Sequence, residues 1–241
     1  MMNDYKLSLA FCTIDETYSL KQSYENISAL NLVDEFVFIV AQNATPECIR
    51  TVEELCANPK CRYVFQSQPG LGNAIREAIK FVHGTHIVVW PADNDMDISA
   101  LPEMVRVSKE NPKKIITVSR WLAKDGFKEY GKIKTLLNFC SQKIFAFLYK
   151  SQLTDFTNPT QIAPIKIYRN IKWTGTGFDF IPEMIFKPLK LGYSFMEVPC
   201  KSLKRQEGKK HRTLKELMRY FLVILKIYRM SESDILVGDK F

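Results

Sequence analysis

The chain has 241 residues, of which 46% are hydrophobic and 25% charged, and its formal net charge is +8. This length and hydrophobic content are ample for one large packed domain. No apolar run reaches the roughly 20 residues that a bilayer-spanning helix needs, so we expect a soluble or peripheral protein. Six cysteines show no zinc-type spacing, and no secretory signal stands at the N-terminus, which favours free thiols in the cytoplasm.

Strands and helices alternate through the first half of the chain. Apolar runs predict strands over 6–13, 36–40, 62–66, 87–90 and 115–118, and helical patterns predict helices over 17–30, 46–57, 72–82 and 101–109. Runs that are apolar throughout, such as 36–40, are typical of parallel strands covered on both faces. This order predicts a mostly parallel sheet with ligands at the carboxyl ends of its strands.

The second half has a different texture. We expect helices over 130–150, 177–191 and 213–230, a strand over 194–199, a polar loop over 155–161 and a basic loop over 201–212. Residues 1–212 are predicted to form one domain, and residues 213–241 a basic amphipathic helix and tail. The apolar stripe of that helix suits an anchor in a membrane interface, and packing on the domain or on a second copy of the chain fits it equally.

Positive charge is concentrated in residues 201–230, which hold ten Lys or Arg against two Glu. Such a patch favours an anionic partner, which leaves phosphate groups, a membrane surface or nucleic acid open. Strand ends that are rich in acids argue against nucleic acid.

The most informative segment runs from Gly70 to Asp97. Gly70 and Gly72 open a helix whose first backbone N–H groups favour anions, although a tight turn alone would use the same residues. The following strand ends at Asp93 and Asp95, and carboxylates at this spacing can bind Mg²⁺ or Mn²⁺. We predict a metal role for Asp93 and Asp95 and a helix-capping role for Asp97.

Seven motifs follow one another in a fixed order. They are Cys-Thr-Ile-Asp-Glu at 12–16, Gly-Leu-Gly-Asn-Ala at 70–74, Pro-Ala-Asp-Asn-Asp at 91–95, Val-Ser-Arg at 118–120, and the segments 177–183, 197–199 and 205–211. In this series, from about residue 7 to about residue 212, the chain resembles the family 2 glycosyltransferases. Within that family it resembles the transferases that act on dolichyl or polyprenyl phosphate.

The resemblance implies a three-layer α/β fold of the GT-A type, which is Rossmann-like with a mostly parallel central sheet. It implies an inverting transfer of a sugar from a nucleotide-diphosphate sugar to a polyprenyl phosphate or a growing surface glycan. Mg²⁺ or Mn²⁺ on Asp93 and Asp95 would neutralise the leaving diphosphate. The nucleotide-binding residues it implies are Thr13, Glu16, Asn43, Gly70, Gly72 and Asp93.

Further candidate residues would bind phosphate oxygens or accept a proton from the acceptor. Four basic residues would bind phosphate of the donor or of a lipid acceptor, with a solvated surface as the alternative: Arg120, Arg205, Lys210 and His211. An acceptor phosphate needs no strong base, whereas a sugar hydroxyl needs a carboxylate, for which Asp155 and Glu183 are candidates. Hydrogen bonds that fix loops are the alternative for both acids.

Departures from the family pattern leave other functions open. Residues 41–44 read Ala-Gln-Asn-Ala where the family has an acidic motif, Pro91 replaces an Asp, and Asn-Pro-Thr-Gln follows at 158–161. A non-catalytic nucleotide-sugar-binding or scaffold protein of the same fold is therefore the alternative. A nucleotidyltransferase would need a glycine-rich N-terminal signature, which is missing. We expect a cytoplasmic protein, peripheral at the membrane if the last helix meets lipid, and leave a homo-oligomer open.

Overall fold

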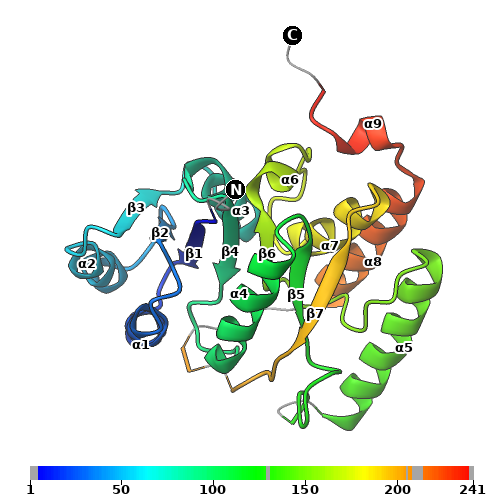
Figure 1. Ribbon diagram of the computed structural model, residues 1–241, viewed down its shortest axis with the longest axis horizontal. Coiled ribbons are helices and arrows are strands. Elements are labelled where there is room, and N and C mark those ends of the chain that lie inside the picture. The colour runs from blue at the N-terminus through cyan, green and yellow to red at the C-terminus, as the bar shows by residue number, and fades with distance from the viewer. Residues whose placement is uncertain (1–4, 129–130, 205, 208–213, 239–241) are drawn as a thin grey trace.

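The structure is a computed structural model that describes residues 5–128, 131–204, 206–207 and 214–238. Seven strands form one sheet in the order β3-β2-β1-β4-β6-β5-β7 (Figure 1). The strands are β1 (Leu7–Thr13), β2 (Glu35–Val40), β3 (Cys61–Phe65), β4 (His86–Trp90), β5 (Ile115–Ser119), β6 (Gln161–Pro164) and β7 (Phe195–Pro199). All pairings are parallel except those of β6, which runs antiparallel to β4 and β5.

Helices cover both faces of this sheet, which makes three layers. They are α1 (Tyr18–Ala29), α2 (Pro46–Leu55), α3 (Leu71–Phe81), α4 (Leu101–Glu110), α5 (Lys132–Leu148), α6 (Ile165–Arg169), α7 (Phe180–Lys190), α8 (Leu214–Arg229) and α9 (Glu232–Ile235), with the 3₁₀ turn η1 (Ile98–Ala100) before α4. Apolar residues of α1, α2 and α4 form one core with the sheet, and those of α3, α6, α7 and α8 form the other. The predicted α/β architecture with a mostly parallel sheet is confirmed.

The parallel register brings the ends of the first strands to one edge. Thr13 of β1 pairs with Val40 of β2, and Phe11 pairs with Trp90 of β4. Because the chain leaves each strand at this edge, the loops that follow β1, β2 and β4 lie together there. The observed elements begin and end within one to three residues of the predicted ones, and the predicted start of α2 is confirmed by Thr45, whose side chain accepts the Cys48 N–H.

Several short elements were not predicted: the strand β6, the helix α6 that follows it, the turn η1 and the helix α9. The polar loop predicted over 155–161 ends where β6 begins. β6 has four residues, starts at Gln161 and ends at Pro164, so its composition carries no strand pattern. It is a strand because it pairs with β4 and β5, so tertiary structure and not local sequence determines its conformation.

The C-terminal helix α8 packs on the domain, which was one of the roles left open for it. Ile224 and Ile227 are each 1% exposed within the core of α7, and the Tyr149 hydroxyl donates to the Ile224 carbonyl at 2.8 Å. The predicted boundary between residues 212 and 213 lies outside the described residues. Within the described ranges, no helix is both long and apolar enough to cross a bilayer.

Candidate active site

A cavity of about 560 Å³ opens at the edge where β1, β2 and β4 end. The loop after β1, the start of α3, the loop after β4 and the residue after β5 all contribute to its wall. Seven of the predicted site residues line it: Thr13, Glu16, Asn43, Gly70, Asp93, Asp95 and Arg120. Three predicted residues do not line it, namely Gly72, Asp155 and Glu183. Arg205, Lys210 and His211 lie outside the described residues.

The two candidate metal ligands follow the central strand β4 directly. Asp93 is buried, with 7% exposed, and Asp95 is half-buried. Between them, Asn94 adopts a left-handed φ of 57°, a conformation that Asn tolerates better than most residues. Its side-chain amide donates to Gln22 at 2.8 Å and to Gln206 at 2.9 Å. These bonds fix the turn that carries both carboxylates.

The donor set suits a hard divalent cation. Mg²⁺ in proteins typically takes one or two carboxylates, and water and substrate phosphate oxygens complete its octahedron. Across the described ranges, no three His, Cys, Asp or Glu side chains gather into a metal site. Asp93 and Asp95 are the carboxylates that could hold such a cation at this edge of the sheet.

The predicted capping role of Asp97 is confirmed. Its side chain accepts the Ser99 N–H at 3.0 Å and so begins the turn η1, which leads directly into α4.

Residues 201–204 and 206–207 form a strap beside the loop that carries Asp93 and Asp95. The Leu203 N–H donates to the Asp95 carbonyl at 2.8 Å, and the Gln206 N–H donates to the Asp93 carbonyl at 3.1 Å. Glu207 then fastens the strap to the start of α1. Its carboxylate accepts the N–H of Thr17 at 3.0 Å and of Ser19 at 2.8 Å, together with both hydroxyls. Burial opposes ionisation of Glu207, but the bonds from Ser19 and Thr17 outweigh it and lower its pKa.

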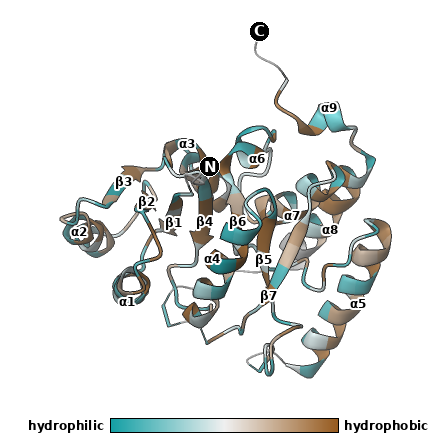
Figure 2. Cartoon of the chain, in the orientation of Figure 1, coloured by the Kyte–Doolittle hydropathy of each residue, from teal (hydrophilic) through white to brown (hydrophobic). Residues whose placement is uncertain are grey.

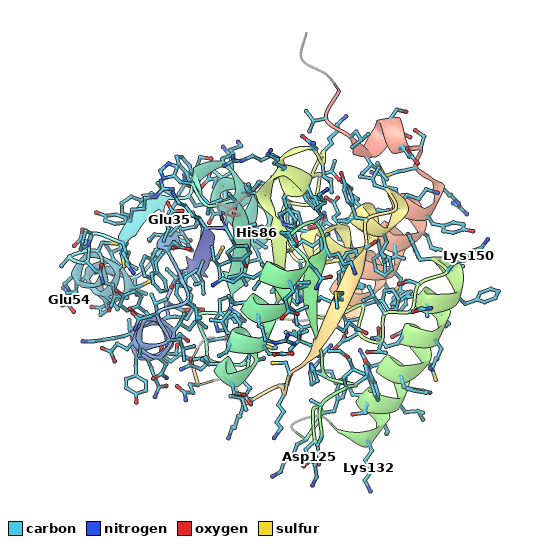
Figure 3. The ribbon with its side chains drawn as sticks, in the orientation of Figure 1. Glu35, Glu54, His86, Asp125, Lys132 and Lys150 are labelled. Carbon is cyan, nitrogen blue, oxygen red and sulfur yellow. The ribbon has the colours of Figure 1, made fainter. Side chains whose placement is uncertain are left out.

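Removing this anchor is expected to loosen the loop that carries Asp93 and Asp95. Glu207→Ala deletes the shared acceptor of four donors, and we expect it to lower the free energy of unfolding by about 1.5–3 kcal/mol. We also expect weaker binding of Mn²⁺ with a nucleotide sugar, measured by titration calorimetry. Glu54→Ala is the matched control, because Glu54 is exposed on α2 and points away from the body of the protein (Figure 3). If both variants bind alike, the strap does not position the loop.

Asp155 and Arg120 form a buried bidentate ion pair. Nε of Arg120 donates to Oδ2 at 2.7 Å and Nη2 donates to Oδ1 at 2.8 Å, and Asp155 is fully buried. Burial raises the pKa of Asp155, but its contacts with Arg120 and the backbone outweigh burial and lower it. A carboxylate with a lowered pKa is a weak base, so the geometry favours the alternative role, in which Asp155 fixes its loop and orients Arg120.

Glu183 has a similar setting on α7. It is 3% exposed, forms an ion pair with the buried Lys187 at 2.9 Å, and accepts the backbone N–H groups of Thr174 and Gly175. Each of these contacts holds the loop before α7. For Glu183, as for Asp155, this geometry favours the alternative role of fixing a loop over the predicted role as a proton acceptor.

Gly72 also serves packing. Its N–H donates to the Thr176 carbonyl at 3.0 Å, and a Cβ there would come within 2.6 Å of the Gly175 carbonyl oxygen. The close approach that Gly72 permits is to this neighbouring loop, which favours a structural role for Gly72 over its predicted role in binding a nucleotide. Gly70 does line the cavity, at a φ of 106° that other residues rarely adopt.

Several cavity residues were not singled out from the sequence. Thr157, Asn158 and Thr160 line the wall from the polar loop before β6, and Ser202 lines it from the strap. The sequence shows that these residues are polar, but no local sequence pattern predicts that they lie beside β4.

Comparisons with known proteins agree with this fold. A family model for glycosyl transferase family 2 matches residues 8–171. Glucosyl-3-phosphoglycerate synthase from Mycobacterium tuberculosis, in complex with Mn²⁺, UDP-glucose and phosphoglyceric acid, has a TM-score of 0.71 at 15% identity, covering 95% of this chain and 82% of that chain. A second structure of that enzyme, with Mn²⁺, UDP and phosphoglyceric acid, has a TM-score of 0.70 at 15% identity, covering 95% and 80%. Another mycobacterial protein has a TM-score of 0.69 at 16% identity, covering 95% and 76%. The fold is of the GT-A type.

Proposed function

The chain belongs to glycosyltransferase family 2, and we propose that it transfers a sugar, with inversion, from a nucleotide-diphosphate sugar to a membrane-borne acceptor. The observation that carries this proposal is the pair Asp93 and Asp95 at the end of β4, in a cavity that Thr13, Glu16 and Gly70 also line. Because these residues come from separate strand ends and meet in one cavity, they suit a single extended ligand with a diphosphate at its centre.

The donor would lie with its diphosphate beside Asp93 and Asp95. When bound, Mg²⁺ or Mn²⁺ would neutralise the negative charge that develops on the leaving nucleoside diphosphate. The mycobacterial synthase of similar fold was solved with Mn²⁺ and UDP-glucose, which supports this choice of cation and donor class. Thr13, Glu16, Asn43 and Gly70 would surround the nucleotide.

Arg120, together with the ion pair that engages Asp155, favours a phosphate as the acceptor. Among the described lining residues the acids are Asp15, Glu16, Asp93 and Asp95, and Asp155 lies behind the wall in its pair with Arg120. Arg120 itself lines the cavity, where a guanidinium suits phosphate oxygens. An acceptor phosphate is already anionic and needs no general base. A polyprenyl phosphate fits these conditions better than a glycan hydroxyl does.

A panel of UDP-, GDP-, CDP- and dTDP-sugars, with and without Mn²⁺, tests the proposal by thermal shift and calorimetry. One donor should stabilise the protein only with Mn²⁺, by about 2.7 kcal/mol at a concentration of 100 times its Kd. Asp93→Ala should lose this effect. Failure of every donor with metal present would contradict the transferase assignment. Donor binding without transfer to any polyprenyl phosphate or glycan would favour the non-catalytic alternative.

A further inference from the structure

Helix α5 exposes an apolar face that the proposed reaction does not use. Exposed fractions are 83% for Phe147, 78% for Ile133, 67% for Leu137, 62% for Leu136 and 54% for Ile144. Successive members of this set are three, one, seven and three residues apart, so at about 100° per residue they share one side of the helix. α5 lies along one edge of the molecule (Figure 1), and much of it has the colour of hydrophobic residues (Figure 2). We call these five residues the α5 face.

The opposite side of α5 is docked on the domain. Phe145 is 2% exposed and contacts the rings of Phe156 and Phe186. The side chain of Gln142 accepts the Phe156 N–H at 2.7 Å, and the Asn138 amide donates to the Thr157 hydroxyl at 3.2 Å. The helix is therefore held in place, and packing against the described part of the chain does not explain its outward apolar side chains.

Lysines border the α5 face and acids are absent from its helix. Lys132, Lys134, Lys143 and Lys150 are exposed, and residues 131–154 contain no Asp or Glu. Lys132 and Lys150 project outward from the two ends of the helix (Figure 3). An apolar stripe bordered by cations matches the interface of a bilayer with anionic headgroups, where the stripe enters the acyl boundary and lysines stay at headgroup level.

We propose that the α5 face docks on the surface of a membrane that contains anionic lipids. A second copy of the chain fits the same face less well. A two-fold symmetric contact would bring lysines toward lysines, and α5 offers no carboxylate to pair with them. Apolar faces of this extent on soluble monomers mark interaction sites, and the charge of this one favours lipid.

The neighbouring helix α8 widens the surface. The ring of Phe221 lies 5.6 Å from that of Phe145, and the ring of Tyr228 lies 5.7 Å from that of Tyr149, so the two helices are side by side. On α8, Leu222 is 63% exposed. The membrane contact that the sequence left open for the last helix is thus assigned chiefly to α5, with α8 beside it.

Docking through α5 has a consequence for the cavity. Thr157, which accepts the bond from Asn138, also lines the cavity wall. The bilayer would therefore lie on the far side of a helix that supports the cavity wall through Thr157, which suits an acceptor that stays in the membrane. The docking itself does not rest on the proposed transfer, because it needs neither donor nor metal.

Vesicle sedimentation tests the docking, with the full chain and no nucleotide. The probes are vesicles of phosphatidylcholine alone and of phosphatidylcholine mixed with phosphatidylglycerol. We expect binding to the mixed vesicles, a loss of at least about tenfold in Leu137→Ser/Phe147→Ser, and a loss of about 25-fold in Lys132→Ala/Lys143→Ala at about fivefold per lysine. All four residues are exposed, so the variants should keep the fold, which circular dichroism checks.

Phe65→Ser is the matched control, because Phe65 is 51% exposed on β3, the strand at the opposite edge of the sheet. It should bind vesicles as the unaltered chain does. The proposal is overturned if the unaltered chain does not bind the mixed vesicles, or if all variants bind them as well as the unaltered chain does. It is also overturned if light scattering shows a dimer that Leu137→Ser/Phe147→Ser converts to a monomer without vesicle binding. Donor binding is measured separately, so failure here leaves the proposed function standing.

Discussion

Asp93→Asn is expected to lower sugar transfer about a thousandfold, the rate equivalent of about 4 kcal/mol, while the fold is retained. The buried carboxylate of Asp93 lines the cavity at the end of β4, where it would share the cation with Asp95. An amide of nearly the same shape keeps the packing but removes one negative charge from the proposed metal site. Transfer is measured as kcat/KM across a Mn²⁺ titration, in which the variant should need far more metal.

Asp97→Asn is the control for this experiment. Asp97 is two residues from Asp95 on the same loop, and its side chain caps η1, a role that Asn also performs well. Its transfer rate should stay close to that of the unaltered chain. Retention of more than about a tenth of the activity in Asp93→Asn, with an unchanged Mn²⁺ requirement, would remove Asp93 from the metal site, since loss of a cation ligand costs far more.

Much of the fold was accessible from the sequence because the local signals agree with the tertiary structure. The strand over 36–40 is apolar throughout, as a strand covered on both faces must be, and the observed β2 is buried from Phe36 to Val40. Thr45 and Pro46 mark the start of α2 by their own chemistry. The strand β6 was missed because the sheet determines it: its register with β4 and β5 compensates for a composition that predicts a loop.

The candidate site was partly accessible for a related reason. Thr13 ends β1, Glu16 and Asp93 follow strands, and the carboxyl ends of parallel strands share an edge, so their meeting could be expected. Contacts between segments that are distant in sequence could not be expected in this way. Glu207 reaches Ser19 across 188 residues of sequence, and no local pattern marks it apart from its being an acid in a basic segment. Asp155 resembles a catalytic acid in sequence, and only its pairing with Arg120 shows what its carboxylate contacts.

Asp155→Ala is expected to destabilise the protein by about 3–5 kcal/mol, because it leaves the buried guanidinium of Arg120 without its bidentate partner. Chemical denaturation measures the loss. The folded-state pKa of Asp155 is lowered, so its contribution is fully present above the ordinary carboxyl pKa of about 3.9 and is lost as the pH falls through the folded value. The unfolding free energy of the unaltered chain should therefore decline more steeply in acid than that of the variant.

Two comparisons separate this expectation from a general effect of charge removal. Glu103→Ala breaks an exposed ion pair with Arg106 at 2.7 Å, and it should cost less than about 1 kcal/mol. Arg120→Met/Asp155→Leu removes both buried charges, and it should be more stable than Asp155→Ala because no buried guanidinium is left without its carboxylate. The double variant should still lose transfer activity, since Arg120 lines the cavity. A double variant less stable than Asp155→Ala would mean that packing around the pair, and not charge compensation, holds this loop.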